Sequence, residues 1–519
     1  MRRWLTWSIL ALILIAVAVL AASSVRLDSA TADEGAHIAS GYLKLRHGWL
    51  DFYADQPALC DTLNALPLRG YDFPPVSGNP WEVGHQFLHE SGFDVNRLLW
   101  LARLPSIAML LALCVAVFLF VRRWSRSDAW ALVAAALTGF CPNILAHGRL
   151  ATPDIQVTLF VFVAAALCLE MFEKPRAITA IALGVAVALA VLVKLSGLII
   201  GPYLALLFLF RLRKNLVKPI AIAVAAALIT FIAAYAIVAG PDYLHATNSS
   251  RLTVAFHAYA KHIATVRYWY SGESGQVQYL NGQFSTKGWP HYYLAALGLK
   301  VPIGAQILFL AAVVLAFRKK APFALRACLL FIAVFFVALA RSDLDLGVRY
   351  ALPLLPFAFS AIGLALAQVK SRAAMIGAGV LVAWHVTASV LAYPGYISYF
   401  NEFVRDQRAK DLYLIDSNLD WGQDLRRLDL WCREHNVDAI TVNYFGAGEP
   451  TRELHARVTT WPGPNGPPPP KGWFALSRHL YRLTFFPQMS PVSYATYLAN
   501  SHARYVTTVG GSIDVYRVE

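Results

Sequence analysis

The sequence predicts a polytopic α-helical membrane protein with a small α/β domain at its C-terminal end. Three observations carry this prediction: 57% of the 519 residues are hydrophobic, only 15% are charged, and the apolar residues form runs long enough to cross a bilayer. This composition excludes a disordered chain and a small disulfide-rich domain. The net charge of +14 does not indicate a nucleic-acid-binding protein, because the basic residues form small clusters between apolar runs.

About eleven apolar runs are expected to span the membrane. They cover residues 5–23, 98–120, 129–146, 155–172, 177–193, 196–210, 219–240, 292–316, 325–340, 350–369 and 374–392. The first run has a second interpretation, a signal peptide cleaved near Ala21-Ala22-Ser23. Its apolar stretch is long for a signal peptide, which favours a retained helix.

The basic clusters between these runs define the orientation of the chain. If the spans alternate, every cluster falls on one side, which the positive-inside rule assigns to the cytoplasm. The clusters are Arg2-Arg3, Arg122-Arg123-Arg126, Lys174-Arg176, Arg211-Arg213-Lys214-Lys218, Arg318-Lys319-Lys320 and Lys370-Arg372. The opposite, outer side then receives residues 24–97, 147–154, 241–291, 341–349 and everything after about 393.

The more polar C-terminal region predicts a separate outer α/β domain over residues 394–519, following a membrane domain over 1–393. Its pattern predicts strands at 412–415, 439–444, near Ala475 and at 505–509, and a helix at 423–435. Residues 461–470 are rich in proline and glycine and predict an exposed extended loop. Cys60 and Cys432 both lie on the outer side, where a disulfide between them could form but is not required.

Two groups of acidic residues on the outer side are candidates for a catalytic site. Asp33 and Glu34 follow the first span, and His37 would share a helix face with Asp33. Adjacent carboxylates can bind a cation or accept a proton, but acids also favour the first turn of a helix. Asp154 ends the short loop 147–154 and could equally cap the next helix. Either group alone leaves both interpretations open.

Three cations fall on the same outer half. Lys194 lies near the outer end of the fifth span, where its ammonium could extend to lipid headgroups. Lys300 and Arg349 are better candidates for binding an anionic group such as a lipid phosphate. Acids and cations on one face suggest a site for a lipid-linked phosphoester. A transporter or flippase for an anionic or lipid-linked substrate would also need such residues.

The chain resembles the bacterial relatives of protein O-mannosyltransferases, which are integral-membrane glycosyltransferases of the GT-C fold that use polyprenyl-phosphate-linked sugars. The resemblance covers nearly the whole chain, and its most distinctive piece is the run from Asp416 to Leu425. The other matching pieces are Asp33-Glu34, Gly41-Tyr42, Gln56-Pro57-Ala58-Leu59 with Ala65-Leu66-Pro67-Leu68, Asp154, Tyr279-Leu280-Asn281-Gly282, Tyr292-Tyr293 to Lys300-Val301-Pro302, and Gly347-Val348-Arg349-Tyr350.

This resemblance implies inverting transfer of a sugar from a polyprenyl phosphate to an acceptor on a protein, glycolipid or envelope glycan. It also implies a multi-pass protein of a bacterial inner membrane whose active site faces the periplasm. Asp33 would be the general base, Glu34 would orient it or hold a cation, and Asp154 would position the acceptor or a metal. The donor phosphate would bind Lys300, Arg349 and, less directly, Lys194. The remaining acceptor or positioning residues would be His37, Tyr42 and Tyr293.

Two points stay open at this stage. Asp33, Glu34 and Asp154 could hold Mg²⁺ or Mn²⁺ through oxygen, but their spacing does not require a metal. The run 416–424 could cap the following helix through Ser417 or Asp420, or it could cover the active site, with Trp421 as an apolar anchor or a stacking surface for sugar. A non-catalytic scaffold would leave the outer acids, Lys300 and Arg349 unexplained, whereas a transporter would place charges at the membrane midplane.

The sequence departs from the family pattern in the first outer segment. Relatives commonly carry a His-Pro-Pro-Leu turn where this chain has Gln56-Pro57-Ala58-Leu59. The segment from Asp72 to Asp94 is also longer than the pattern. Both differences bear on how the donor and the acceptor are placed.

Overall fold

Apolar helices form most of the chain before residue 392 in the computed structural model. The structure describes residues 3–53, 55–211, 213–270, 275–463, 471–486, 490 and 492–519. Five helices in these residues are long and apolar enough to cross a membrane, and six more are apolar but shorter. Each of the eleven predicted spans corresponds to one of them. They are α1 (Arg3–Val25), α5 (Val95–Ser125), α6 (Asp128–Gly139), α8 (Asp154–Glu173), α9 (Ala177–Val193), α10 (Ile200–Arg211), α11 (Val217–Val238), α15 (Ile303–Ala316), α16 (Phe323–Leu339), α17 (Leu354–Leu366) and α18 (Arg372–Leu391). The chain is therefore a multi-pass membrane protein.

Three of the predicted spans are interrupted rather than continuous. The run 129–146 divides into α6 and α7 (Pro142–His147), and the run 292–316 divides into α14 (Tyr292–Lys300) and α15. The run 350–369 becomes a 3₁₀ turn η5 (Val348–Ala351) followed by α17. Each break falls at Pro142, Pro302 or Pro353. Proline has no N–H for the helix ladder and its ring crowds the preceding turn, so it begins a new helix.

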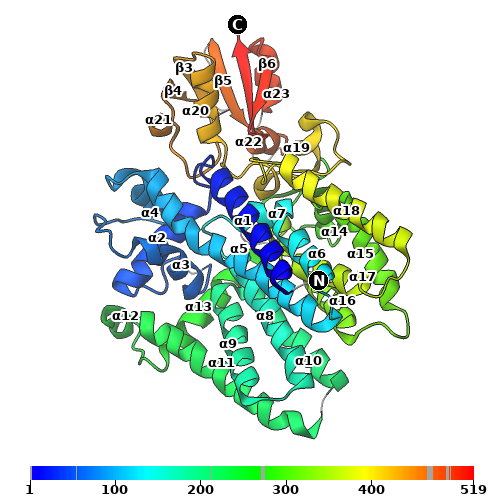
Figure 1. Cartoon of the computed structure of the whole chain (residues 1–519). Coiled ribbons are helices and arrows are strands. Elements are labelled where there is room, and N and C mark those ends of the chain that lie inside the picture. Colours follow the sequence, from blue (N-terminus) through cyan, green and yellow to red (C-terminus); the bar gives the residue numbers. More distant parts are fainter. Residues whose placement is uncertain are drawn as a thin grey trace.

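The helices pack against one another in a bundle (Figure 1), and their buried side chains form a continuous apolar core. α1 packs against α5 and α6 through buried Leu10, Val17 and Ala21, and the Thr6 hydroxyl donates a 2.8 Å hydrogen bond to Asp128. All six cysteines are buried and free, so the disulfide considered between Cys60 and Cys432 does not form.

The segments between the membrane helices carry structure of their own. Residues 24–97 form α2 (Glu34–His47), α3 (Ala58–Ala65), η1 (Leu66–Leu68), α4 (Pro80–His85) and the π-helical turn η2 (Gln86–Glu90). Residues 241–291 form α12 (Pro241–Ala246), α13 (Val254–Tyr270) and the hairpin of β1 (Gln278–Leu280) and β2 (Gln283–Ser285). Short turns η3 (Leu195–Ile199) and η4 (Lys214–Leu216) precede α10 and α11.

The C-terminal region forms a small domain around a five-stranded mixed sheet of order β4-β3-β5-β7-β6. The strands are β3 (Ala439–Asn443), β4 (Arg457–Thr460), β5 (Gly472–Ser477), β6 (Arg504–Val509) and β7 (Ile513–Val518). β3 pairs in parallel with β4 and β5, while β7 runs antiparallel to β5 and β6. The connecting helices are η6 (Gln407–Ala409), α19 (Lys410–Tyr413), η7 (Asp416–Asn418), α20 (Leu425–Glu434), α21 (Pro450–Glu453), α22 (Arg478–Leu483) and α23 (Tyr494–Asn500).

This domain confirms most of the expected local structure. The predicted helix at 423–435 and the strands at 439–444, Ala475 and 505–509 correspond to α20, β3, β5 and β6. The predicted strand at 412–415 is wrong, because α19 ends at Tyr413 and the next residues make no ladder. Part of the proline-rich loop, residues 464–470, lies outside the described residues, and Trp461 at its start is buried rather than exposed.

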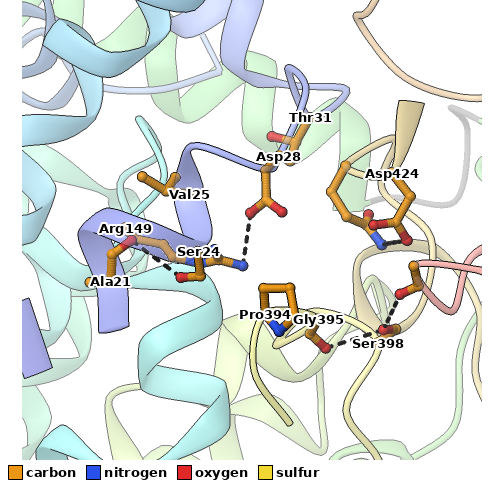
Figure 2. Close-up of polar contacts among 12 residues, drawn as sticks. Ala21, Ser24, Val25, Asp28, Thr31, Arg149, Pro394, Gly395, Ser398 and Asp424 are labelled. Atoms are coloured by element: carbon orange, nitrogen blue, oxygen red, sulfur yellow. Dashed lines mark hydrogen bonds and ion pairs between the residues drawn. The ribbon is translucent and has the colours of Figure 1, made fainter. Parts of the chain in front are cut away.

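The sheet domain sits over one end of the helical bundle (Figure 1). Buried charges join the two parts. Asp28, between α1 and α2, pairs with Arg149 of the short loop 147–153 at 2.8 Å and with Arg427 of α20 at 2.6 Å. Figure 2 shows the Asp28–Arg149 pair beside Asp424, which also pairs with Arg427. The Ser398 hydroxyl donates to the carbonyl of Gly510 in the β6–β7 turn at 2.9 Å. These contacts fix the sheet domain against the membrane helices.

Candidate active site

A cavity of about 270 Å³ lies where the helical bundle meets the sheet domain. Its wall combines charged groups with aromatic rings contributed by distant parts of the chain. The titratable lining residues are Asp33, His37, Tyr53, Asp55, Lys194, Arg349, Tyr350 and Asp416, and the other aromatic ones are Trp81, Trp269, Trp421 and Phe445. The cavity therefore brings together Asp33, His37, Lys194 and Arg349, four of the residues predicted from the sequence.

Asp33 and Arg349 form the central ion pair of this cavity. Asp33 precedes the first residue of α2, and its carboxylate accepts a 3.0 Å hydrogen bond from the Arg349 guanidinium. The Arg349 guanidinium also stacks over the Trp421 ring at 4.3 Å, so an aromatic face from the sheet-domain side holds it in place. The Asp33 side chain keeps 22% of its surface exposed, whereas Arg349 keeps 8%. The carboxylate is thus accessible from the cavity.

The loop before Arg349 is fixed by several buried hydrogen bonds. Asp345 accepts from the Trp289 backbone N–H at 2.6 Å, and burial raises the pKa of its carboxyl group to about 7. The Tyr293 hydroxyl donates to the carbonyl of Leu344 at 3.0 Å, and the Asn418 side chain accepts from the Val348 N–H at 2.8 Å. Tyr293 is not a wall residue of the cavity. Its hydroxyl instead holds the loop that presents Arg349.

Lys194 reaches the cavity from the break between α9 and η3. Its backbone is extended at this point, and its ammonium pairs with the buried Asp154 carboxylate at 2.6 Å while lying 4.3 Å from the Tyr350 ring centre. Extension of Lys194 to lipid headgroups is therefore wrong, because a buried partner inside the protein holds the charge. Asp154 itself is fully buried behind Pro153, and it acts on the cavity through Lys194.

Glu34 lies outside the cavity, although it follows Asp33 directly. Both of its oxygens accept from the Arg103 guanidinium at 2.6–2.7 Å, and the N–H groups of Thr31 and Ala151 donate to it at 3.0 and 2.9 Å. Burial opposes the charge, but Arg103 and these donors outweigh it and lower the pKa of Glu34. The predicted joint action of the two acids does not fit this geometry, because Glu34 closes an ion pair with Arg103 instead of facing Asp33.

Lys300 and Tyr42 also lie away from the cavity. The Lys300 ammonium is buried and donates to the backbone carbonyls of Ile397 and Asn418 at 2.7 and 2.5 Å. It therefore ties the end of α14 to the segments after α18, and direct contact with a donor phosphate does not fit this position. The Tyr42 hydroxyl donates to the carbonyl of Tyr71 at 2.9 Å within an aromatic cluster of the first outer segment.

His37 lines the cavity and is oriented from behind. Its Nδ1 lies 2.8 Å from a carboxylate oxygen of Asp61, whose other oxygen accepts from Lys44 at 2.7 Å and from Ser40 at 2.8 Å. Burial opposes the Asp61 charge, but Lys44 and His37 lower the pKa of this carboxyl group to about 2. Asp61 therefore acts as the fixed anion that sets the orientation of the His37 ring.

The predicted metal ligands do not assemble in the described residues. Asp33, Glu34 and Asp154 are each paired with a different cation: Arg349, Arg103 and Lys194. A group of His37, Cys60 and Asp61 has ligand atoms within 4.8 Å of one another, but Lys44 already neutralises its only carboxylate. A divalent ion would have to displace a buried ammonium or guanidinium from any of these acids. These residues do not fit a metal, and no chemical step is assigned to one.

Comparison with known proteins agrees with this architecture. Residues 85–237 match the sequence profile of the dolichyl-phosphate-mannose-protein mannosyltransferase family. The crystal structure of ArnT from Cupriavidus metallidurans bound to undecaprenyl phosphate is similar over 98% of this chain and 97% of that one, with 14% identity and a TM-score of 0.50. The chain has the GT-C fold and resembles the protein O-mannosyltransferases.

Two further solved structures are more distantly similar. The match to the archaeal oligosaccharyltransferase AglB from Archaeoglobus fulgidus covers 98% of this chain and 74% of that one, with 11% identity and a TM-score of 0.47. The match to the S. cerevisiae protein O-mannosyltransferase Pmt1-Pmt2 complex covers 49% of this chain and 36% of that one, with 17% identity and a TM-score of 0.36. No curated protein sequence matches the chain.

Several wall residues of this GT-C cavity were not predicted from the sequence. Asp55 accepts a hydrogen bond from the Trp269 indole N–H at 3.1 Å. Burial raises the pKa of the Asp55 carboxyl group, although this hydrogen bond acts to lower it. Gln56, the next residue, also lines the cavity. The dense run of polar and aromatic residues around 51–56, in a segment expected outside the membrane, was the available signal for this part of the wall.

The run 416–424 is both structural and part of the cavity wall. Asp424 precedes α20, and no side chain caps that helix, so the expected cap from Ser417 or Asp420 is wrong. The buried Asp420 instead accepts from the Ser477 hydroxyl at 2.5 Å and from the N–H groups of Gly422 and His479 at 3.2 Å. This bonding holds Trp421 against Arg349, and Asp416 faces the cavity beside it.

Proposed function

We propose that the chain is an inverting glycosyltransferase that moves a sugar from a polyprenyl-phosphate-linked donor to an acceptor hydroxyl or amine. The observation that carries the proposal is the Asp33–Arg349 pair, an accessible carboxylate held beside a buried guanidinium in an aromatic-lined cavity. Such a pair provides a proton acceptor and a positive charge next to one another. The undecaprenyl phosphate bound to the similar ArnT supports a lipid phosphate as the carrier.

In the proposed reaction the acceptor oxygen or nitrogen attacks the anomeric carbon of the sugar. The bond between that carbon and the phosphate oxygen breaks, and the polyprenyl phosphate leaves with the electron pair. Asp33 takes the proton from the acceptor as the new bond forms. Attack from the face opposite to the leaving phosphate inverts the anomeric configuration.

Arg349 and Lys194 would stabilise the negative charge that grows on the leaving phosphate. A guanidinium fork fits phosphate oxygens well, and preplaced cations in a closed site lower the barrier because they need not reorganise. Asp154 pairs with Lys194 at 2.6 Å and holds its ammonium at the cavity. Lys300 contributes to this proposal as a structural anchor and not as a phosphate ligand.

The aromatic rings would bind the sugar and the acceptor. Trp421 already carries Arg349 on one face, and Trp81 and Trp269 stand elsewhere in the wall. Apolar sugar faces pack well on such rings. The positive-inside rule supports an outer position for this cavity, and we propose a bacterial inner-membrane protein that acts on a periplasmic protein, glycolipid or envelope glycan.

The test is sugar transfer by the purified full-length protein and its Asp33→Asn variant. The protein is incubated with radiolabelled polyprenyl-phosphate sugars and envelope extracts, and both labelled acceptor and released polyprenyl phosphate are measured. Loss of a general base is expected to reduce the rate by about 100- to 10,000-fold. Asp72→Asn is the matched control, because Asp72 is an exposed aspartate of the same outer segment.

Full activity of Asp33→Asn at wild-type expression would remove Asp33 from the mechanism. The transport alternative is measured in parallel with the protein in vesicles. Movement of intact labelled donor across the bilayer, without release of polyprenyl phosphate, would favour a transporter over a transferase.

A further inference from the structure

A second charged cavity, of about 300 Å³, lies where the ends of α1 and α5 meet α20 of the sheet domain. Three arginines from separate segments line it: Arg26 follows α1, Arg97 lies in the first turn of α5, and Arg426 lies in α20. It shares no lining residue with the cavity that contains Asp33. Its function therefore does not depend on the proposed transfer reaction.

These three guanidinium groups have no carboxylate partner among the described residues. Arg26 stacks over the Trp100 ring at 4.4 Å, and Arg426 donates to the Asn96 side chain at 2.6 Å. Two other charged residues line the cavity, and both are neutralised from behind. Asp28 pairs with Arg149 and Arg427, and Arg103 pairs with Glu34. The three arginines thus leave the cavity with an excess of positive charge.

The placement of two of these arginines differs from that of the basic clusters of the chain. The basic clusters of this chain lie at the opposite ends of the membrane helices, as the positive-inside rule expects, whereas Arg26 and Arg97 lie on the sheet-domain side. Arg97 also lies at the positive end of the dipole of α5, a helix of 31 residues. An anion bound between the three groups would neutralise the excess positive charge at this place.

The cavity also lies at the level expected for lipid headgroups. Trp100 belongs to the first turns of α5, and tryptophan is enriched at the membrane surface. One turn further along α5, Leu104 leaves 37% of its surface exposed for contact with lipid. The guanidinium groups are therefore at the boundary between the hydrocarbon and the sheet domain.

We propose that Arg26, Arg97 and Arg426 form a binding site for the phosphate group of an anionic ligand at the membrane surface. Guanidinium groups bind phosphate oxygens through paired hydrogen bonds, and three of them from different segments would surround a tetrahedral anion. The phosphate belongs either to an anionic lipid headgroup or to a free phosphate, and the arms of the experiment distinguish these two sources. Binding would also link α1 and α5 to the sheet domain through Arg426.

Isothermal titration of the full-length protein in neutral detergent tests the site. The probes are dioctanoyl phosphatidylglycerol, dioctanoyl phosphatidylcholine and inorganic phosphate. The site variant is the triple Arg26→Gln, Arg97→Gln, Arg426→Gln. The matched control, Arg405→Gln, Arg457→Gln, Arg504→Gln, removes the same charge from exposed arginines elsewhere on the sheet-domain side.

We expect saturable binding of phosphatidylglycerol that weakens on the order of 100-fold in the site triple and stays within about twofold in the control triple. Phosphatidylcholine should bind more weakly than phosphatidylglycerol, because its ammonium cancels the phosphate charge. Competition by inorganic phosphate would identify the phosphate alone as the ligand, and lack of competition would identify the lipid headgroup.

The site is refuted if the wild type shows no saturable binding, if both triples lose affinity equally, or if the site triple keeps wild-type affinity. If the triple variant does not fold, the double variant Arg26→Gln, Arg97→Gln replaces it, since both side chains are exposed. A loss on the order of tenfold is then expected, and unchanged affinity refutes the site in the same way.

Discussion

At the scale of single residues, the partner of each charge determines what that charge can do. Arg349 and Lys194 hold accessible or cavity-facing positions, and their partners Asp33 and Asp154 belong to the same region. Lys300 instead donates to two buried backbone carbonyls, and Glu34 pairs with the buried Arg103. The sequence favoured Lys300 over Lys194 as a phosphate ligand, whereas the contacts favour Lys194, so contact geometry is needed to separate candidate reacting groups from structural ones.

The substitution Lys300→Met should lower stability without changing donor binding. It leaves the carbonyls of Ile397 and Asn418 without their buried donor, which costs about 1–3 kcal/mol. Thermal unfolding in detergent measures the first effect, and the donor KM of the folded fraction measures the second. Lys320→Met, at an exposed lysine between α15 and α16, is the control. A raised donor KM at unchanged stability would restore Lys300 as a phosphate ligand.

At the scale of secondary-structure elements, α2 owes its position to close contact with α3. Gly41 faces the backbone of α3 so closely that a Cβ atom there would lie 1.9 Å from the carbonyl oxygen of Asp61. Asp61 orients His37 from the same helix pair. The absence of a side chain at Gly41 therefore sets the distance between α2 and the anion behind the cavity.

The substitution Gly41→Ala should destabilise the protein, because α2 must move away from α3. Overpacking of this kind costs about 1–3 kcal/mol, and displacement of α2 should also reduce transfer activity. Gly377→Ala on α18 is the control, since nothing lies within 4 Å of its added methyl group and alanine favours a helix. Thermal unfolding of both variants and the wild type in detergent measures the effect. A Gly41→Ala variant as stable as Gly377→Ala would contradict the close contact between α2 and α3.

The membrane helices could be predicted because hydrophobicity over about 20 residues is a strong signal. The breaks at Pro142, Pro302 and Pro353 were missed because hydrophobicity alone does not mark them. The strand expected at 412–415 was wrong because a short apolar stretch suits either a strand or part of a short helix and the turn after it. Contacts such as Arg349–Trp421 and Lys194–Asp154 depend on how the helices are rotated and packed, which topology does not specify.

At the scale of the whole molecule, the candidate active-site cavity is shared between the membrane helices and the chain that follows them. Asp416, Trp421 and Phe445 come from beyond α18, while Asp33 and Lys194 come from the membrane part. The buried pairs around Asp28 hold these two parts in register. Movement of the sheet domain would therefore open the cavity and take the Trp421 ring away from Arg349.

The free energy of unfolding of the protein should decrease as pH rises toward neutrality because of Asp420, which is buried between the run 416–424 and the sheet domain. Burial raises the pKa of its carboxyl group from 3.8 to about 7, so the folded protein holds a proton that the unfolded chain releases. The contribution is fully present below about pH 4 and is lost as pH rises through about 7, by up to about 4 kcal/mol. Thermal unfolding between pH 5 and 8 should show a steeper slope in wild type than in Asp420→Asn, which keeps the part of the slope that comes from Asp345. An equal slope in both would assign it to another group.

The Asp33–Arg349 pair also has a consequence for the order of events under the proposed function. An incoming donor phosphate competes with Asp33 for the same guanidinium, so its arrival frees the carboxylate to take a proton. Donor binding would thus release the Asp33 carboxylate from its ion pair, and the acceptor would bind second. Initial-rate kinetics should show the donor as the obligatory first substrate, and in Arg349→Met this obligatory sequence should become random. Random addition in the wild type would mean that the carboxylate is available before the donor arrives.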